Sequence, residues 1–121
     1  MENDLTKRLF RFSIEVIVFL RDIKNNQETG IIKYQLIKSS TSSGANYEES
    51  QAASSKADFT NKVSISLKEM RESNYWLRII KASDIYKSEK LNELISESSE
   101  LKKNIRRNLH QSKKKQITLH F

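Results

Sequence analysis

The sequence predicts an all-α fold, an antiparallel up-down-up-down four-helix bundle. Proline is absent and glycine occurs only twice in 121 residues, so the chain lacks the residues that form the turns of β-rich folds. Apolar residues recur every three or four positions over four long segments, which is the spacing of a helix that buries one face. Short polar turns separate the segments, and helices joined in this way pack most simply as antiparallel neighbours. We predict one domain, residues 1–112, followed by a basic C-terminal tail at residues 113–121.

The first predicted helix covers residues 4–24 and has two apolar stripes. The longer stripe consists of Leu5, Leu9, Phe12, Val16, Phe19 and Ile23. The shorter one, Phe10, Ile14 and Ile17, lies on another flank. We expect the longer stripe to face the core and the shorter one to face a neighbouring subunit.

The second predicted helix covers residues 27–53 and contains an unusual serine-rich run. Asn25 and Glu28 have the spacing of a capping box at its start. Its seam is Ile32, Leu36, Ser39, Ser43, Asn46, Ser50 and Ala53. The run from Ser39 to Gly44 has the composition of a flexible linker, yet it is in register with the helix on both sides. We therefore expect its small side chains to face the core and to let another helix approach closely.

The third and fourth predicted helices cover residues 56–83 and 89–112. Ser55 and Asp58 match the spacing of a capping box, and Ser88 is the expected cap of the fourth helix. The two seams are Phe59, Val63, Ser66, Met70, Ser73, Leu77 and Ile80, then Leu91, Leu94, Ser98, Leu101, Ile105 and Leu109. Alternation of Ile117, Leu119 and Phe121 with polar residues predicts that the tail is extended.

Asn46 is the one amide on the predicted seam, and a buried amide without partners costs about 1–3 kcal/mol. Glu69 and Glu72 of the third helix are the candidate partners. The three residues predict a structural polar core that fixes the register of the helices. A polar functional site inside the bundle is the alternative.

Enzymatic and metal chemistry find no support in the sequence. There is no cysteine, and no serine has a histidine in a recognisable catalytic motif. A glycine-rich phosphate loop needs more than the lone Gly44. Di-metal bundles use Glu-x-x-His pairs, whereas neither His110 nor His120 follows a glutamate at that spacing. We therefore predict no catalytic residues, no metal and no cofactor.

The sequence also gives an expectation for the compartment. Charged residues crowd the N-terminus, so no signal peptide is visible. The longest apolar run, Val16 to Leu20, is far shorter than the roughly 20 residues of a membrane span. We expect a cytoplasmic protein that has no contact with membranes.

The net charge of +7 is concentrated at the C-terminal end. Residues 1–100 hold 15 basic and 15 acidic residues, whereas residues 101–121 hold seven basic residues and no acid. The candidate nucleic-acid-binding residues are Lys102, Lys103, Arg106, Arg107, Lys113, Lys114 and Lys115. Such a cluster suits the phosphates of RNA or DNA, with affinity that falls as salt rises. A solvated face that only aids solubility is the alternative reading.

The segment from Tyr34 to Ile80 resembles a known family. The matching residues are Gln35-Leu36, Lys38, Ser39, Thr41-Ser42, Gly44-Ala45-Asn46, Glu48-Glu49, Ser55 to Phe59, Lys68-Glu69 with Glu72, and Tyr75-Trp76-Leu77. This run resembles the four-helix-bundle proteins encoded within intervening sequences of bacterial large-subunit ribosomal RNA. The resemblance implies a four-helix bundle that assembles as a homopentameric ring and has no established enzymatic activity.

Relatives of that family with a suggested role are the accessory proteins of diversity-generating retroelements, which resemble it in fold and are thought to bind nucleic acid and a reverse transcriptase. From the residues and the resemblance together, we predict a non-enzymatic, oligomeric protein that binds nucleic acid through its basic C-terminal surface. The alternative is a protein-interaction scaffold that recruits a partner enzyme such as a reverse transcriptase.

Overall fold

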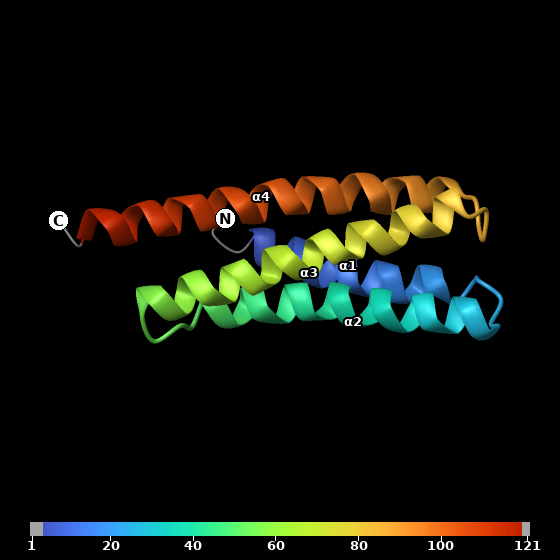
Figure 1. The fold of residues 1–121 in the computed structure, drawn as a ribbon, viewed down its shortest axis with the longest axis horizontal. Coiled ribbons are helices and arrows are strands. Elements are labelled where there is room, and N and C mark those ends of the chain that lie inside the picture. Colours follow the sequence, from blue (N-terminus) through green and yellow to red (C-terminus); the bar gives the residue numbers. More distant parts are fainter. Residues whose placement is uncertain (1–3, 120–121) are drawn as a thin grey trace.

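The computed structural model describes the backbone of residues 4–119 and the side chains of residues 5–114. This part of the chain forms four α-helices: α1 (Asp4–Leu20), α2 (Gln27–Ser50), α3 (Lys56–Ala82) and α4 (Glu89–Leu119). Each helix packs on the next one along the chain, and α1 also packs on α4 (Figure 1). The predicted all-α, up-down-up-down bundle is thus confirmed.

The apolar core follows the stripes predicted from the sequence. In α1 the buried residues include Leu9, Phe12, Val16 and Phe19, and the turn after it buries Ile23. Comparable rows line α3 and α4, and together they form one continuous cluster. Burial of such side chains stabilises the fold by about 1.5–3 kcal/mol each, which makes this cluster the main source of stability.

Serine hydroxyls fill the contact between α2 and α3. Ser43 Oγ donates to Ser66 O at 2.8 Å, and Ser66 Oγ donates back to Ser43 O at the same distance. One step along the bundle, Ser39 Oγ and Ser73 Oγ lie 2.8 Å apart. All four serines are fully buried. The serine-rich run is therefore helical and core-facing as predicted, and its hydroxyls bond across the helix contact.

Gly44 of α2 lies beside the backbone of α1. A Cβ atom added there would lie 3.5 Å from the Leu9 carbonyl oxygen, which is ordinary van der Waals contact. Nearby, Ser13 Oγ of α1 donates to Ser40 O of α2 at 3.0 Å. The small residues at this crossing let a side-chain hydroxyl reach a backbone carbonyl of the neighbouring helix, as the periodicity indicated.

Three helix starts are capped, and one of them differs from the prediction. The cap of α2 is Asn26 with Thr29, whose side chains and backbone amides bond reciprocally at 2.9 Å, so the predicted pair Asn25 and Glu28 is wrong. Ser55 caps α3 as predicted by accepting from the Asp58 amide. Ser88 Oγ likewise accepts from the Leu91 amide at the start of α4.

The helix ends differ from the predicted ones, most of all in α4. The first helix ends at Leu20 instead of residue 24, the second at Ser50 instead of 53, and the third at Ala82 instead of 83. In contrast, α4 runs beyond residue 112 to Leu119, so an extended tail is wrong for residues 113–119. Phe121 lies outside the described residues.

Candidate nucleic-acid interface

The basic residues of α4 lie in two neighbouring rows on its solvent side. Lys102, Arg106 and Lys113 recur at spacings of four and seven residues and form one row. The adjacent row consists of Lys103, Arg107 and Lys114. All of these side chains are exposed except that of Lys102, which is half-buried. The side chain of Lys115 lies outside the described residues. The helix thus gathers six of the seven predicted basic residues on one surface.

Arginines of α3, which were not among the residues predicted from the sequence, extend this surface. Burial lowers the pKa of the Lys102 ammonium, and the nearby positive charges of Arg78, Arg71, Arg106 and Lys103 lower it further. Arg71 and Arg78 lie seven residues apart, so they share one side of α3, and their charges act on Lys102. The cationic surface therefore crosses from α4 onto α3. We name it the basic surface: Arg71, Arg78, Lys102, Lys103, Arg106, Arg107, Lys113 and Lys114.

A buried amide holds Arg78 in place. Asn74 is buried between α3 and α4, where its Nδ2 donates to Ser98 Oγ at 2.8 Å. Its Oδ1 accepts from Arg78 Nε at 2.9 Å. The guanidinium also lies 5.9 Å from the centre of the Tyr75 ring, close enough for a cation–π contact. Arg78 is therefore oriented before any partner arrives, with an exposed aromatic ring beside it.

The basic surface and the opposite flank of α4 differ in their ion pairing. On the α1 side, Arg8 forms a bidentate pair with Glu97 at 2.8 and 3.1 Å, which raises the pKa of Arg8. Lys90 pairs there with Glu15 at 3.0 Å. Within the side chains of residues 5–114, no salt bridge reaches Lys102, Lys103, Arg106 or Arg107. Salt bridges therefore neutralise Arg8 and Lys90 on the α1 side of the bundle but none of these four cations of α4.

The predicted polar core around Asn46 does not form. Asn46 is half-buried, and its amide donates to the Ser42 carbonyl and hydroxyl of its own helix. Glu72 accepts from Trp76 Nε1 at 3.2 Å. Among the described side chains, no hydrogen bond joins Asn46 to Glu69 or Glu72. The structure therefore does not bring the three residues together in one hydrogen-bonded network.

Tyr47 takes the buried position that Asn46 was predicted to occupy. Its ring is in the core, and its hydroxyl accepts from Asn108 Nδ2 of α4 at 2.7 Å. Tyr47, Asn74 and the hydroxyl pair of Thr60 and Ser112 all make polar contacts that connect α4 to the other helices near its basic part. A spacing of four instead of three after Ser43 would have identified Tyr47 in the sequence.

A second surface, on the α1–α2 side, is apolar. The exposed large residues there are Phe10, Ile14 and Val18 of α1 and Ile31 and Tyr34 of α2, which we name the apolar stripe. Phe10 and Ile14 line a shallow hollow together with Glu48 of α2. Phe10 and Ile14 of the shorter predicted stripe do stay out of the core, whereas Ile17 is half-buried and Val18 is the third exposed residue.

Metal ligands and membrane spans can be assessed over the described residues. Among the described side chains, those of residues 5–114, no three His, Cys, Asp or Glu residues gather as ligands of one metal ion would. None of the four described helices combines the length and the apolar character needed to cross a bilayer.

Comparison with known proteins identifies a family and similar solved structures. Residues 1–107 match the family model described as "23S rRNA-intervening sequence protein". A crystal structure from Bacteroides thetaiotaomicron, described as a protein with unknown function from the S23 ribosomal protein family, superposes with a TM-score of 0.79. The two chains are 28% identical, and the match covers 87% of this chain and 97% of the other. No functionally curated protein is significantly similar in sequence.

Proposed function

Because this chain belongs to the 23S rRNA-intervening sequence protein family, whose model matches residues 1–107, we propose that it is a non-enzymatic protein that binds RNA or DNA backbones through the basic surface. The observation that carries the proposal is the separation of charge on α4. One flank of that helix is neutralised by ion pairs with α1, while the other joins the cations of α3. Such a surface attracts polyanions. We propose that the protein is cytoplasmic and binds nucleic acid there.

The arrangement of the cations favours contacts to phosphates over reading of base pairs. The two rows of α4 follow a straight helix surface, and Arg78 is already oriented by Asn74. Neutralisation of several phosphates releases counterions, so the logarithm of affinity should fall linearly with the logarithm of salt concentration. Each phosphate contact contributes about one unit to that slope.

Charge reversal tests the proposal. We expect the variant Lys103→Glu/Arg107→Glu to bind structured RNA far more weakly at low salt and to reduce the salt slope by about two. The matched control is Arg21→Glu/Lys24→Glu, which makes the same change in net charge at exposed positions in the turn between α1 and α2. Binding is measured by fluorescence anisotropy across a salt titration. Equal losses in the two variants would show that only net charge matters and would refute the interface.

We infer a second function, self-association, from the apolar stripe. Five large apolar residues of α1 and α2 are exposed, and contiguous exposed apolar patches mark interaction sites. The family resemblance noted in the sequence supports a second copy of this chain as the partner, in a homopentameric ring. A scaffold that recruits a partner enzyme is the alternative use of the same stripe. Light scattering separates the two: a monomer mass for the purified chain would refute self-association and leave the scaffold.

A further inference from the structure

One end of the bundle contains a polar cavity that the basic surface does not explain. It exists because the helices differ in length: α1 has 17 residues, whereas α4 has 31. Figure 1 shows α1 beginning short of the end where α2 turns into α3 and where α4 extends farthest. The space left over encloses about 430 Å³ between α2, α3 and α4, and sites for small ligands commonly enclose about 300–1,000 Å³.

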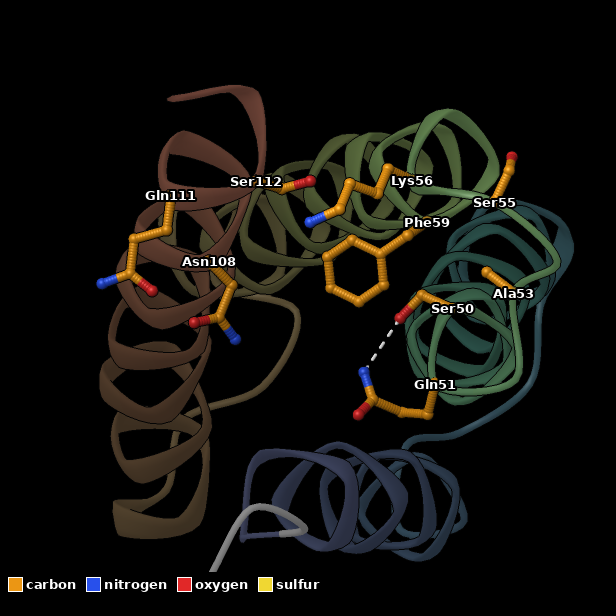
Figure 2. Close-up of a pocket in the computed structure, with 9 residues that line it drawn as sticks. All are labelled: Ser50, Gln51, Ala53, Ser55, Lys56, Phe59, Asn108, Gln111 and Ser112. Atoms are coloured by element: carbon orange, nitrogen blue, oxygen red, sulfur yellow. Dashed lines mark hydrogen bonds between the residues drawn. The ribbon is translucent and has the colours of Figure 1, made fainter. Parts of the chain in front are cut away.

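The lining combines one aromatic ring with three carboxamides. Figure 2 shows the ring of Phe59 at the centre, with the amides of Gln51, Asn108 and Gln111 around it and the ammonium of Lys56 nearby. Phe59 also packs against the apolar core, which holds its ring in position. The residues that line the cavity include no carboxylate, so a negatively charged ligand meets no repulsion from them.

Part of the hydrogen-bonding capacity of these amides is unused. Asn108 Nδ2 donates to the Tyr47 hydroxyl at 2.7 Å, which orients the amide. Burial raises the pKa of Tyr47 while the hydrogen bonds with Asn108 and Gln51 oppose this, so the hydroxyl is neutral at physiological pH. Among the described residues, Asn108 Oδ1 and the Gln111 amide have no hydrogen-bond partner. A carboxamide offers a donor beside an acceptor, the pattern that matches the edge of a nucleobase.

The cavity borders one of the two basic rows of α4, the row of Lys103, Arg107 and Lys114. Arg107 lies four residues before Gln111 and Lys114 three residues after it, so the two cations flank Gln111 on the helix surface. Both are exposed. A strand whose phosphates follow this row therefore passes the mouth of the cavity.

We propose that this end cavity receives one unpaired base of the bound nucleic-acid strand. The base stacks on Phe59, the amides of Gln111, Asn108 and Gln51 bond to its edge, and Lys56 contacts an adjacent phosphate. The inference rests on the proposed function, because the basic surface holds the strand. A base in a duplex is already stacked and paired, so the cavity makes the protein prefer single strands. Stacking of one base on an aromatic side chain raises affinity by about 5- to 150-fold.

Two variants test the cavity. Phe59→Leu keeps an apolar side chain against the core and removes the aromatic face, and Gln111→Ala removes an exposed amide without touching the core. The control is Asn92→Ala, an exposed amide of α4 at the opposite end of the bundle. Each is titrated against a single-stranded RNA of about 12 nucleotides, within the usual footprint of such proteins, and against a blunt duplex of the same sequence.

We expect Phe59→Leu to weaken single-strand binding about tenfold, Gln111→Ala to weaken it about threefold, and neither to change duplex binding. Asn92→Ala should match the unmodified protein on both probes. Single-strand affinities that stay unchanged in both cavity variants would overturn the base pocket, and so would equal losses on strand and duplex. Thermal unfolding of Phe59→Leu shows whether its fold is intact, and Gln111→Ala decides the matter if it is not.

Two further comparisons distinguish failure of the proposed function from failure of the base pocket. If Lys103→Glu/Arg107→Glu loses affinity for both probes while the cavity variants lose none, the proposed function stands and the base pocket is refuted. If that charge reversal changes neither affinity, the proposed function fails and the pocket inference fails with it. Free mononucleotide is the last probe: binding as tight as that of the strand, abolished by Phe59→Leu, would assign the cavity to a free nucleotide and overturn the strand proposal.

Discussion

The two opposite sides of this bundle have different chemistry although the helices that form them share one core. The α1–α2 side exposes the apolar stripe, with Phe10 and Tyr34 each 63% exposed. The α3–α4 side exposes the basic surface, whose cations lower the pKa of Lys102. A small bundle can thus separate two kinds of contact, one apolar and one ionic, by assigning each to a different pair of helices. We expect the first to mediate association between copies and the second to bind nucleic acid.

The largest effect is expected where the two sides are joined, at the serine contact between α2 and α3. Ser43→Leu inserts a large side chain into a fully buried position and removes the reciprocal bonds with Ser66. Overpacking together with the lost hydrogen bonds should lower the free energy of unfolding by about 2–4 kcal/mol. Urea denaturation measures this value. The control Ser64→Leu, at an exposed position of α3, should stay within about 0.5 kcal/mol, and equal costs would show that the serine contact is not close-packed.

A substitution at Ile14 should disrupt the apolar side of the bundle without changing the basic side. Ile14→Asp places a charge within the apolar stripe, and truncation of a hot-spot residue at the centre of an interface costs about 2 kcal/mol or more. We expect the association constant to fall about 30-fold or more while RNA binding by the dissociated chain is retained. Analytical ultracentrifugation over a concentration series measures the first quantity. Asn92→Asp is the control of equal charge, and a similar loss in it would disconnect association from the stripe.

A smaller effect, opposite in sign, is expected at Gly44. The position has room for a methyl group, because the nearest atom to an added Cβ is 3.5 Å away. Glycine within a helix costs about 0.5–1 kcal/mol relative to alanine, so Gly44→Ala should raise the free energy of unfolding by about that amount. Thermal denaturation measures it. Gly30→Ala, at a site of α2 with open space around it, is the reference, and a loss of stability only at Gly44 would mean that α1 cannot tolerate the methyl group.

The smallest effect concerns Lys102, whose positive charge we expect to lower the free energy of unfolding. The pKa of Lys102 is lower in the folded chain than in the unfolded one. The penalty of the charged ammonium is therefore fully present below the folded pKa and is lost as the pH rises from the folded to the unfolded pKa. Lys102→Gln should therefore stabilise the fold at pH 7 and low salt by up to about 0.5 kcal/mol, a small value because solvent screens the charge. It should also weaken RNA binding. A Lys102→Gln variant that is less stable than the unmodified protein would contradict this expectation. Lys103→Gln controls for the change in net charge.

The helices and the core could be predicted from the sequence because periodicity reports which face of a helix is buried. The prediction failed where two adjacent residues fit the pattern equally well. After Ser43, a step of three leads to Asn46 and a step of four to Tyr47, and the large aromatic ring took the buried position. The same ambiguity between Asn25 and Asn26 led to the wrong cap for α2.

The candidate site was predictable in part. The run of lysines and arginines in α4 is evident in the sequence, but the contribution of Arg71 and Arg78 depends on which flank of α3 faces α4, and a single helix pattern does not reveal that. The end cavity was missed for a related reason. The predicted first and fourth helices had similar lengths, so nothing indicated that one would leave a space beside the other. Alternation over residues 117–121 was too short to outweigh the helix-forming residues before it.

The length of the basic rows sets a footprint on nucleic acid. From Lys102 to Lys114 an α-helix rises about 18 Å, which is about half of the 34–36 Å turn of a B-form duplex. A single chain therefore reaches across about one groove and cannot follow a duplex around its axis. Coverage of a longer tract requires several copies held at a fixed spacing, so the geometry of the apolar stripe would decide how long a stretch of nucleic acid one assembly occupies.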